Sequence, residues 1–535
     1  MENSLLSPPP DKYYLNIGRA SDLKNPRERL VYRILEILPG ALIWGTLVAM
    51  VFFSWFKPVW TAFFIIIFCI YWLSRTVYFV FHLVAAHKKM KENMKIGWLE
   101  ELNKLSKKDP AKNWQEIYHL VIFPMYKEGL GVVRSSFLAL INSQYPKEKM
   151  IVVLAQEERA GEEALTVAKF ISREFGDKFY RFLVTRHKER IEGEIAGKGS
   201  NESWAGREVK EKIIDEAKIP YENIVVSCFD IDTQVFPQYF TCLTYHYLTS
   251  ASPTRASYQP IPLYLNNLWE APFFSRVVSS CNVFWQMIQQ QRPEQIVTYS
   301  SHSMSFKALV EMDFWQTNVV SEDAGIFWKS FLFYDGDYRI VPFHYPLSMD
   351  SCAAKTFWQT IVNQYRQQRR WAWGSEGIPY LLFGLLKNKK IPLKKKLRYP
   401  FLLIEGFWAW GTNAFLVLFL GWLPLIFGGE QFRYTVLAYN LPQIVSYLMD
   451  LALTGLIVCI IISTLLLTPR PRGYSRWRSL SMIVQWIFFP FTFIFFGSIP
   501  AIDAQTRLML GKYMGFWITE KNRKPVLKAA SIDSQ

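Results

Sequence analysis

Blocks of strongly apolar sequence flank a long charged middle region in this chain of 535 residues. The blocks are residues 38–56 and 59–85 before the middle region, and residues 399–427, 444–467 and 480–502 after it. At about 1.5 Å of rise per helical residue, runs of this length cross about 30 Å of hydrocarbon. We therefore predict transmembrane helices on both sides of an extramembrane domain, which excludes a single soluble domain.

Positive charge gathers beside these apolar runs. The chain carries 61 Lys and Arg against 45 Asp and Glu, and much of the excess lies at 88–95 and 394–398. Such flanks face anionic lipid on the cytoplasmic side of a membrane. The charge therefore predicts contact with membrane lipids and not with nucleic acid. We expect an integral protein of the plasma (inner) membrane whose middle domain is cytoplasmic.

The third downstream run leaves the topology open. Both 470–478 and 512–528 are basic, which places both in the cytoplasm, yet the apolar run 480–502 lies between them. Either this run, broken by Pro490 and Pro500, is a re-entrant hairpin, or the stretch 432–467 contains an extra element.

The middle region alternates short apolar runs with helix-like segments. Strands are predicted at 120–123, 150–154, 181–184 and 224–228, and helices at 133–141, 162–175 and 202–219. This alternation predicts a parallel sheet covered by helices on both faces, with ligands at the carboxyl ends of its strands. The six cysteines form no CxxC pair, which is typical of a reducing compartment.

Two acidic motifs carry candidate chemistry. Asp230 and Asp232 follow the predicted strand 224–228, where their carboxylates could hold a hard divalent cation, Mg²⁺ or Mn²⁺. The alternative is a pair of solvated turn aspartates. Asp323, in Ser321-Glu322-Asp323, is a candidate general base. A Ser-Glu-Asp sequence also caps helices, and both roles can coexist.

A third motif, Gln367-Gln368-Arg369-Arg370-Trp371, lies in the amphipathic segment 356–373, which we expect at the membrane interface. The alternative is an interfacial helix that Arg and Trp merely anchor.

The order of these motifs resembles that of membrane-embedded, inverting family 2 glycosyltransferases, similar to cellulose, chitin and hyaluronan synthases. The resemblance implies an α/β GT-A (Rossmann-like) domain, with Asp323 as the base, Asp232 binding the metal and Asp230 binding donor and metal. It implies that Arg370 steadies the diphosphate, that Trp371 stacks on the acceptor sugar and that Gln367 lines the same site.

Further residues follow from the same resemblance. Glu128, in Pro124-Met125-Tyr126-Lys127-Glu128, and Lys198, in Gly197-Lys198-Gly199, match the donor-binding positions. Where the family carries a base-reading aspartate this chain has Ala155-Gln156, so Glu157 is the candidate substitute. Thr519 and Lys521, in 516–521, resemble a gating loop that closes over the donor; the alternative is a basic membrane-flanking tail.

The predicted organisation has six parts: a tail (1–37), a two-span hairpin (38–86), the GT-A domain (88–351), interface helices (352–398), downstream spans (399–502) and a second tail (503–535). The expected function is sugar transfer from a nucleotide sugar, such as a UDP-sugar, to a glycan acceptor in a processive synthase. The alternatives are single transfer to a lipid-linked acceptor, or a non-catalytic transporter or scaffold with Arg75 and Asp450 as intramembrane charges.

Overall fold

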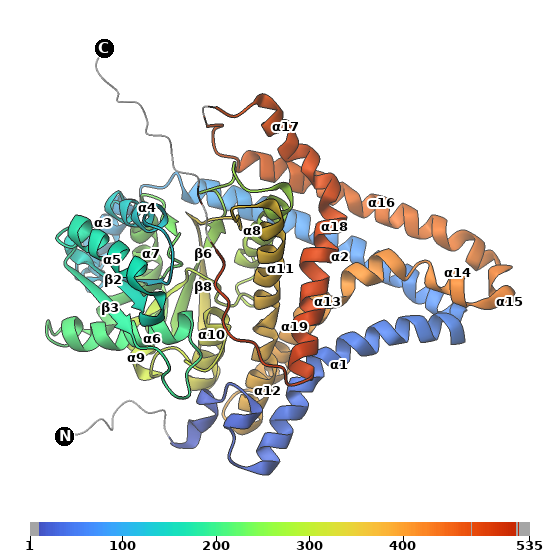
Figure 1. Ribbon diagram of the computed structural model, residues 1–535, viewed down its shortest axis with the longest axis horizontal. Helices are drawn as coiled ribbons and strands as arrows, with labels where there is room; N and C mark the ends of the chain where they lie inside the picture. Colours follow the sequence, from blue (N-terminus) through green and yellow to red (C-terminus); the bar gives the residue numbers. More distant parts are fainter. Residues whose placement is uncertain (1–9, 472, 521–522, 524–535) are drawn as a thin grey trace.

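The computed structural model describes residues 10–471, 473–520 and 523. An α/β domain forms one end of the molecule, and long helices reach away from it at the other end (Figure 1). The predicted α/β domain flanked by long apolar helices is therefore confirmed.

The α/β domain is built on one eight-stranded sheet with the strand order β3-β2-β1-β4-β7-β6-β8-β5. The strands are β1 Tyr118–Met125, β2 Met150–Glu157, β3 Arg181–His187, β4 Ile224–Cys228, β5 Gln234–Val235, β6 Ala256–Leu263, β7 Ser303–Ser305 and β8 Arg339–Ser348. The four predicted strand segments lie within β1–β4, which are mutually parallel.

The prediction of a purely parallel sheet is wrong. β7 is antiparallel to β4 and to β6, and the sheet continues through β8 and β5. The reversal at β7 divides the sheet into a parallel half and a mixed half, and Asp230 and Asp232 follow β4, the strand at which the two halves meet.

Helices cover both faces of the sheet. They are α3 Trp98–Lys108, α4 Leu130–Ile141, α5 Glu162–Phe175, α6 Lys198–Val209, α7 Tyr239–Thr249, α8 Phe273–Gln290, α9 Phe306–Glu311 and α10 Glu322–Phe333. Along β1, Val121 and Phe123 belong to one core, whereas Leu120 and Ile122 belong to the other. Alternate residues thus face opposite layers, which explains the continuous apolar runs of these strands.

The predicted helices differ from the observed ones mainly at their ends. α5 has the predicted bounds. α6 begins at Lys198, earlier than expected, and passes into a π-helical turn at Lys210–Ile214. The predicted amphipathic segment forms α11 Phe357–Ala372, and Thr356 caps it by accepting from the Gln359 amide. α12 Gly377–Lys387 follows it.

Among the residues that the structure describes, five helical segments are long and apolar enough to cross a membrane. They are α1 Pro26–Phe56, α2 Pro58–Asn93, α13 Leu393–Phe419, α16 Val436–Leu465 and the broken segment Arg476–Met509, which contains α17 Arg476–Val484, α18 Phe489–Phe493 and α19 Ile499–Met509. Short helices α14 Leu423–Phe427 and α15 Gly429–Arg433 join α13 to α16 at the far tip of the bundle (Figure 1).

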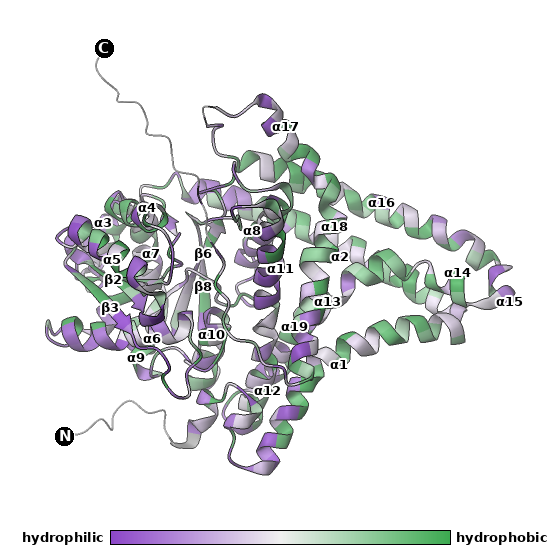
Figure 2. Ribbon diagram, in the orientation of Figure 1, coloured by the Kyte–Doolittle hydropathy of each residue, from purple (hydrophilic) through white to green (hydrophobic). Residues whose placement is uncertain are grey.

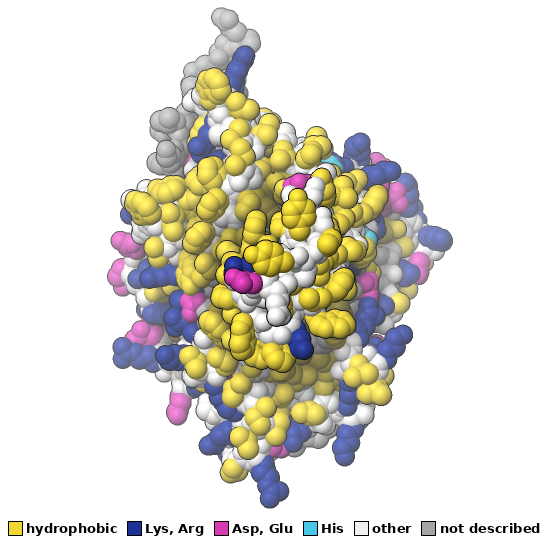
Figure 3. Space-filling view, turned by 90° about the vertical axis from the view of Figure 1, so that its right-hand side faces the viewer, with side chains coloured by type: hydrophobic (Ala, Val, Ile, Leu, Met, Phe, Trp, Pro, Cys, Tyr) yellow, Lys and Arg dark blue, Asp and Glu magenta, His cyan; other side chains and the backbone are white. Residues whose placement is uncertain are grey.

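The projecting helices expose apolar side chains. Figure 2 shows hydrophobic residues along α1, α2, α13 and α16, and Figure 3 shows the same end almost covered by them. Trp60 is 73% exposed and Ile67 is 65% exposed. A contiguous apolar surface of this kind is stable in lipid and not in water. Arg75, one of the intramembrane charges considered for a transporter, lies on α2 and forms an ion pair with Glu405 on α13. This ion pair joins the two helices.

The broken segment Arg476–Met509 runs crosswise to α1 and α16 beside the α/β domain (Figure 1). Residues along its whole length contact that domain or the interface helix: Gln485 with Arg276, Phe496 with Phe274, and Asp503 with Tyr365 and Arg369. We infer that this segment lies at the membrane surface and does not cross. Residues 470–471 and 512–520 would then share one side of the membrane, as the charge rule requires.

Cysteine labelling tests this topology. In a background with the six native cysteines replaced, Tyr434→Cys marks the bundle tip, Lys512→Cys follows α19, and Lys108→Cys marks the α/β domain. In oriented proteoliposomes we expect a membrane-impermeant maleimide to label positions 108 and 512 from one side and position 434 only from the other. Labelling of 512 together with 434 would contradict the arrangement.

Candidate functional site

The ammonium group of Lys198 joins two motifs that lie far apart in the sequence. Its Nζ atom is 3.0 Å from Oδ1 of Asp230 and 2.8 Å from Oδ1 of Asp323. Glu202 and Glu322 lie farther away, each with an oxygen 3.7 Å from the same nitrogen. One buried lysine therefore sits among four carboxyl groups, which we call the Lys198 cluster.

The Lys198 cluster has more acids than cations, so its protonation is unusual. Burial alone would lower the pKa of Lys198, but Asp230 and Asp323 outweigh it and hold the pKa well above its usual range. Burial raises the pKa of Glu202 well above its usual range, although Lys198 opposes the shift. Burial, followed by the charge of Asp323, raises the pKa of Glu322 to about 8. At neutral pH Glu322 is therefore protonated, which relieves charge repulsion in the cluster.

Three elements bring the cluster together. Asp230 follows the carboxyl end of β4, Lys198 begins α6, and Asp323 lies in the first turn of α10. The helix start at α10 favours the charged carboxylate of Asp323 through the helix dipole. Oε1 of Glu376 accepts the backbone amides of Val320 at 3.0 Å and Ser321 at 2.7 Å, which fixes the entry to this helix.

His302 is a neutral neighbour of the candidate base. Its Nδ1 donates to the carbonyl oxygen of Tyr299 at 3.0 Å and lies 3.9 Å from Oδ1 of Asp323. Burial lowers the pKa of His302 to about 4, so the ring is neutral at pH 7. It therefore adds no charge to the Lys198 cluster.

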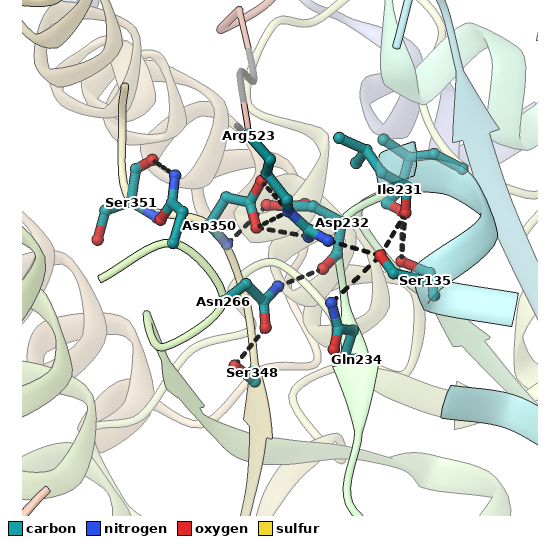
Figure 4. Close-up of polar contacts among 12 residues, drawn as sticks. Ser135, Ile231, Asp232, Gln234, Asn266, Ser348, Asp350, Ser351 and Arg523 are labelled. Carbon is teal, nitrogen blue, oxygen red and sulfur yellow. Dashed lines mark hydrogen bonds and ion pairs between the residues drawn. The ribbon is translucent and has the colours of Figure 1, made fainter. Parts of the chain in front are cut away.

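A second polar group surrounds Asp232 (Figure 4). The backbone amide of Asp350 donates to Oδ2 of Asp232 at 2.8 Å. The Asp350 carboxylate accepts from Nε of Arg523 at 3.0 Å and from its Nη2 at 2.6 Å, and Arg523 Nη1 donates to Oγ of Ser135 at 2.6 Å. Arg523 thus ties the C-terminal segment to the edge that carries Asp232.

The segment 513–520 lies against α11 and the start of α6. Arg370 lies over the Phe516 ring at 4.9 Å, and Gln367 Nε2 donates to Oγ1 of Thr519 at 3.5 Å. Thr519 is buried, and Oε2 of Glu520 accepts a hydrogen bond from the side-chain amide Nε2 of Gln359 at 3.2 Å. The Gln-x-x-Arg-Trp motif and the gating-like segment therefore contact each other. Trp371 packs against the sheet core that includes Phe123, and Lys521 lies outside the described residues.

The glycines beside Lys198 serve close packing. A Cβ atom on Gly197 would lie 2.7 Å from Cβ of Phe516, and one on Gly199 would lie 2.8 Å from Cβ of Glu322. Any side chain at these positions would push away the C-terminal segment or α10. In this structure the two glycines thus admit Phe516 and Glu322.

The other two donor-site candidates lie at the carboxyl ends of β1 and β2. Oε2 of Glu128 accepts the Tyr126 amide at 2.8 Å. Glu157 is buried and forms an ion pair with Arg159, whose guanidinium lies 4.8 Å from the centre of the Tyr126 ring. Glu157 ends β2 and Glu128 follows the neighbouring strand β1, and neither takes part in the ion pairs of the Lys198 cluster.

The candidate metal site consists of two carboxylates. Within residues 10–471, 473–520 and 523, no three His, Cys, Asp or Glu side chains are arranged to hold a metal ion. Asp230 and Asp232 nevertheless offer the oxygen ligands that Mg²⁺ and Mn²⁺ prefer, and Mg²⁺ commonly takes one or two carboxylates together with substrate phosphates. The residues present therefore fit a metal whose coordination the substrate completes.

Sequence reasoning missed several residues of this site. Asp350 follows the end of β8 just as Asp230 follows β4, a signal hidden because β8 was not predicted. Glu202 belongs to no motif, and the sequence indicated only that it lies on a predicted helix. Arg523, Asn266 and Ser135 belong to no motif, so only the folded chain brings them to Asp232.

Neither a family model nor a curated protein matches this chain. Among solved structures it is similar to the mannosyltransferase PcManGT from Pyrobaculum calidifontis in complex with GDP-Man and Mn²⁺, with 13% identity, 73% of this chain and 99% of the other covered, and a TM-score of 0.39. It is also similar to S. aureus TarS 1–349, with 10% identity, 74% and 93% covered, and a TM-score of 0.35. Likenesses this distant do not assign the chain to a family.

The raised pKa of Glu322 makes stability depend on pH. The unfolded carboxyl loses its proton near 4.5, whereas the folded one keeps it up to about 8. Within that window the folded state binds more protons, so the free energy of unfolding falls as pH rises. We expect the melting temperature to fall as the pH rises from 4.5 to about 8, and to fall by several degrees more in the wild type than in Glu322→Gln. Parallel curves for the two proteins would contradict the burial of this proton, and Glu211→Gln is the control.

Proposed function

We propose that the protein is a membrane glycosyltransferase that transfers a sugar, with inversion, from a nucleotide sugar such as a UDP-sugar. One observation carries this proposal: Lys198 Nζ contacts both Asp230 and Asp323, which come from motifs 93 positions apart. A diphosphate-binding cation, a metal-binding carboxylate and a candidate base therefore share one site, as the transfer reaction requires.

The donor diphosphate has two sources of positive charge at this site. Lys198 stands at the first turn of α6, where backbone amides and the helix dipole favour anions. Arg370 faces the same region from α11 and acts on the charge of Glu322. As the bond between the sugar and the diphosphate breaks, these cations stabilise the growing negative charge of the leaving group.

Asp323 is positioned to accept the proton of the attacking hydroxyl. The acceptor oxygen forms a bond to the anomeric carbon while its proton passes to the Asp323 carboxylate, and the bond to the diphosphate breaks on the opposite face. Before donor binding, Lys198 holds both oxygens of Asp323, at 2.8 and 3.0 Å. Attraction of Lys198 to the diphosphate would free one of those oxygens for the acceptor.

A divalent cation would complete the site. Asp232 and Asp230 would hold Mg²⁺ or Mn²⁺, which supplies charge neutralisation at the diphosphate. Over this region the segment 513–520 supplies Phe516 and Thr519, in contact with Arg370 and Gln367. A diphosphate bound near Lys198 would lie beneath this segment, which supports a role for Thr519 and Lys521 in covering the donor.

The acceptor is proposed to be a growing polysaccharide, and the alternative is a lipid-linked acceptor that receives one sugar. The same residues serve both, so the length of the product decides between them. A transporter or scaffold is the remaining alternative, and it would retain its cellular activity when the base is removed.

Replacement of the base tests the proposal. In detergent or nanodiscs with Mn²⁺, release of nucleotide from a panel of UDP- and GDP-sugars is measured for the wild type and Asp323→Asn. We expect release from one donor and a loss of about 10²–10⁴-fold in the variant, because a positioned base contributes that much. The exposed Asp337→Asn is the matched control. Equal rates in wild type and Asp323→Asn would contradict the assigned role.

Removal of metal tests the carboxylate pair. We expect chelation to abolish release and Mn²⁺ or Mg²⁺ to restore it. In Asp232→Asn, half-maximal activity should need at least about tenfold more metal, since one of two charged ligands is lost. Full activity in chelator would show that Lys198 and Arg370 neutralise the diphosphate unaided.

A further inference from the structure

A cleft lies where the domain meets the membrane helices, between α8, the end of α16 and α17. The cleft is small and partly open to the surroundings. Apolar side chains form much of the wall, among them Leu268, Phe284, Leu466 and Met482. None of the residues that line the cleft belongs to the Lys198 cluster, and the proposed reaction uses none of them.

A buried arginine lines this apolar cleft. Arg276 is only 2% exposed. Its Nε donates to Oε1 of Gln485 at 2.7 Å and its Nη1 to the carbonyl oxygen of Ala271 at 2.6 Å, so both bonds go to neutral acceptors. Burial, followed by the charge of Arg478, lowers the pKa of Arg276 to about 10. A charged group held this way is costly unless an anion joins it.

A second guanidinium converges on the same carbonyl. Nη2 of Arg478 donates to the Ala271 oxygen at 3.3 Å and to the Trp269 oxygen at 3.0 Å. Neither Arg276 nor Arg478 forms an ion pair with any carboxylate in the part of the chain that the structure describes. Two neighbouring cations without an anion form a binding site for phosphate, which accepts several charge-assisted hydrogen bonds.

The cleft lies at the level where lipid headgroups are expected. Ser463 and Thr464, at the domain-side end of the apolar helix α16, form part of its wall. On α17 the neighbouring Trp477 is 76% exposed, and Arg470 precedes it in the sequence. Aromatic and basic side chains of this kind mark the membrane interface.

We propose that this cleft binds the phosphate of an anionic membrane lipid, with Arg276 and Arg478 as its ligands and the lipid chains along the apolar wall. The leucine, phenylalanine and methionine side chains favour a ligand with hydrocarbon over a free phosphate ion. Two kinds of lipid carry such a phosphate group: a bulk phospholipid and a polyprenyl phosphate. Tyr264 belongs both to this wall and to the surroundings of Asp230, whose charge acts on its hydroxyl.

Native mass spectrometry of the full chain in detergent tests the site. The probes are phosphatidylglycerol, phosphatidylcholine, a polyprenyl phosphate and inorganic phosphate. We expect retention of the anionic lipids at least about tenfold above phosphatidylcholine, and a loss of about tenfold in Arg276→Gln and Arg478→Gln. Arg476→Gln, an equal charge change at an exposed position of the same helix, should retain the wild-type level.

Each outcome decides the proposal. Preference for polyprenyl phosphate or for phosphatidylglycerol supports it and identifies the source. Equal retention of anionic and zwitterionic lipid, an equal loss in Arg476→Gln, or displacement by inorganic phosphate at the lipid concentration would overturn it. Melting curves show whether Arg276→Gln folds; if it does not, the less buried Arg478→Gln decides. The readout is binding, so the result does not depend on sugar transfer.

Discussion

The ion pairs of Lys198 hold the functional half of the domain together. A buried ammonium is costly without nearby acids, and a buried carboxylate is costly without a nearby cation. Removing one partner of such a pair typically costs about 3–5 kcal/mol, because the other charge stays buried. Through Lys198 the start of α6, the end of β4 and the start of α10 share this dependence. The position of the candidate base is thus coupled to the position of the candidate diphosphate site.

The membrane region contacts the functional half of the domain through one broken segment. The broken segment Arg476–Met509 contacts α8 along one part and α11, which carries the Gln-x-x-Arg-Trp motif, along another. The chain that leaves α19 then passes Gly197 and Arg370 and reaches Asp350 through Arg523. The start of α6, the helix α11 and the segment after α19 are far apart in the sequence, and together they form one wall of the site.

Local pattern was enough to predict some elements and not others. β1, β2 and β4 could be predicted because strands that are buried on both faces have continuous apolar runs. α5 could be predicted from its helical periodicity. β6 and β8 each contain two prolines, and β7 has three residues, so none met the pattern of a strand and the mixed sheet was missed. The motif residues were found by spacing, yet the contact of Lys198 with Asp323 depends on long-range packing. Arg523 and Asp350 needed the fold, since neither belongs to a motif.

Binding of a nucleoside diphosphate tests the central claim most directly, because it needs no acceptor. Calorimetric titration of the purified full chain with UDP and with GDP, each with Mn²⁺, would compare the wild type with Lys198→Gln, and Lys212→Gln would serve as an exposed control. The account predicts binding of at least one diphosphate, weakened at least about tenfold in Lys198→Gln, as loss of a charge-assisted contact requires. Wild-type binding that Lys198→Gln leaves unchanged, in a protein that still melts cooperatively, would contradict it.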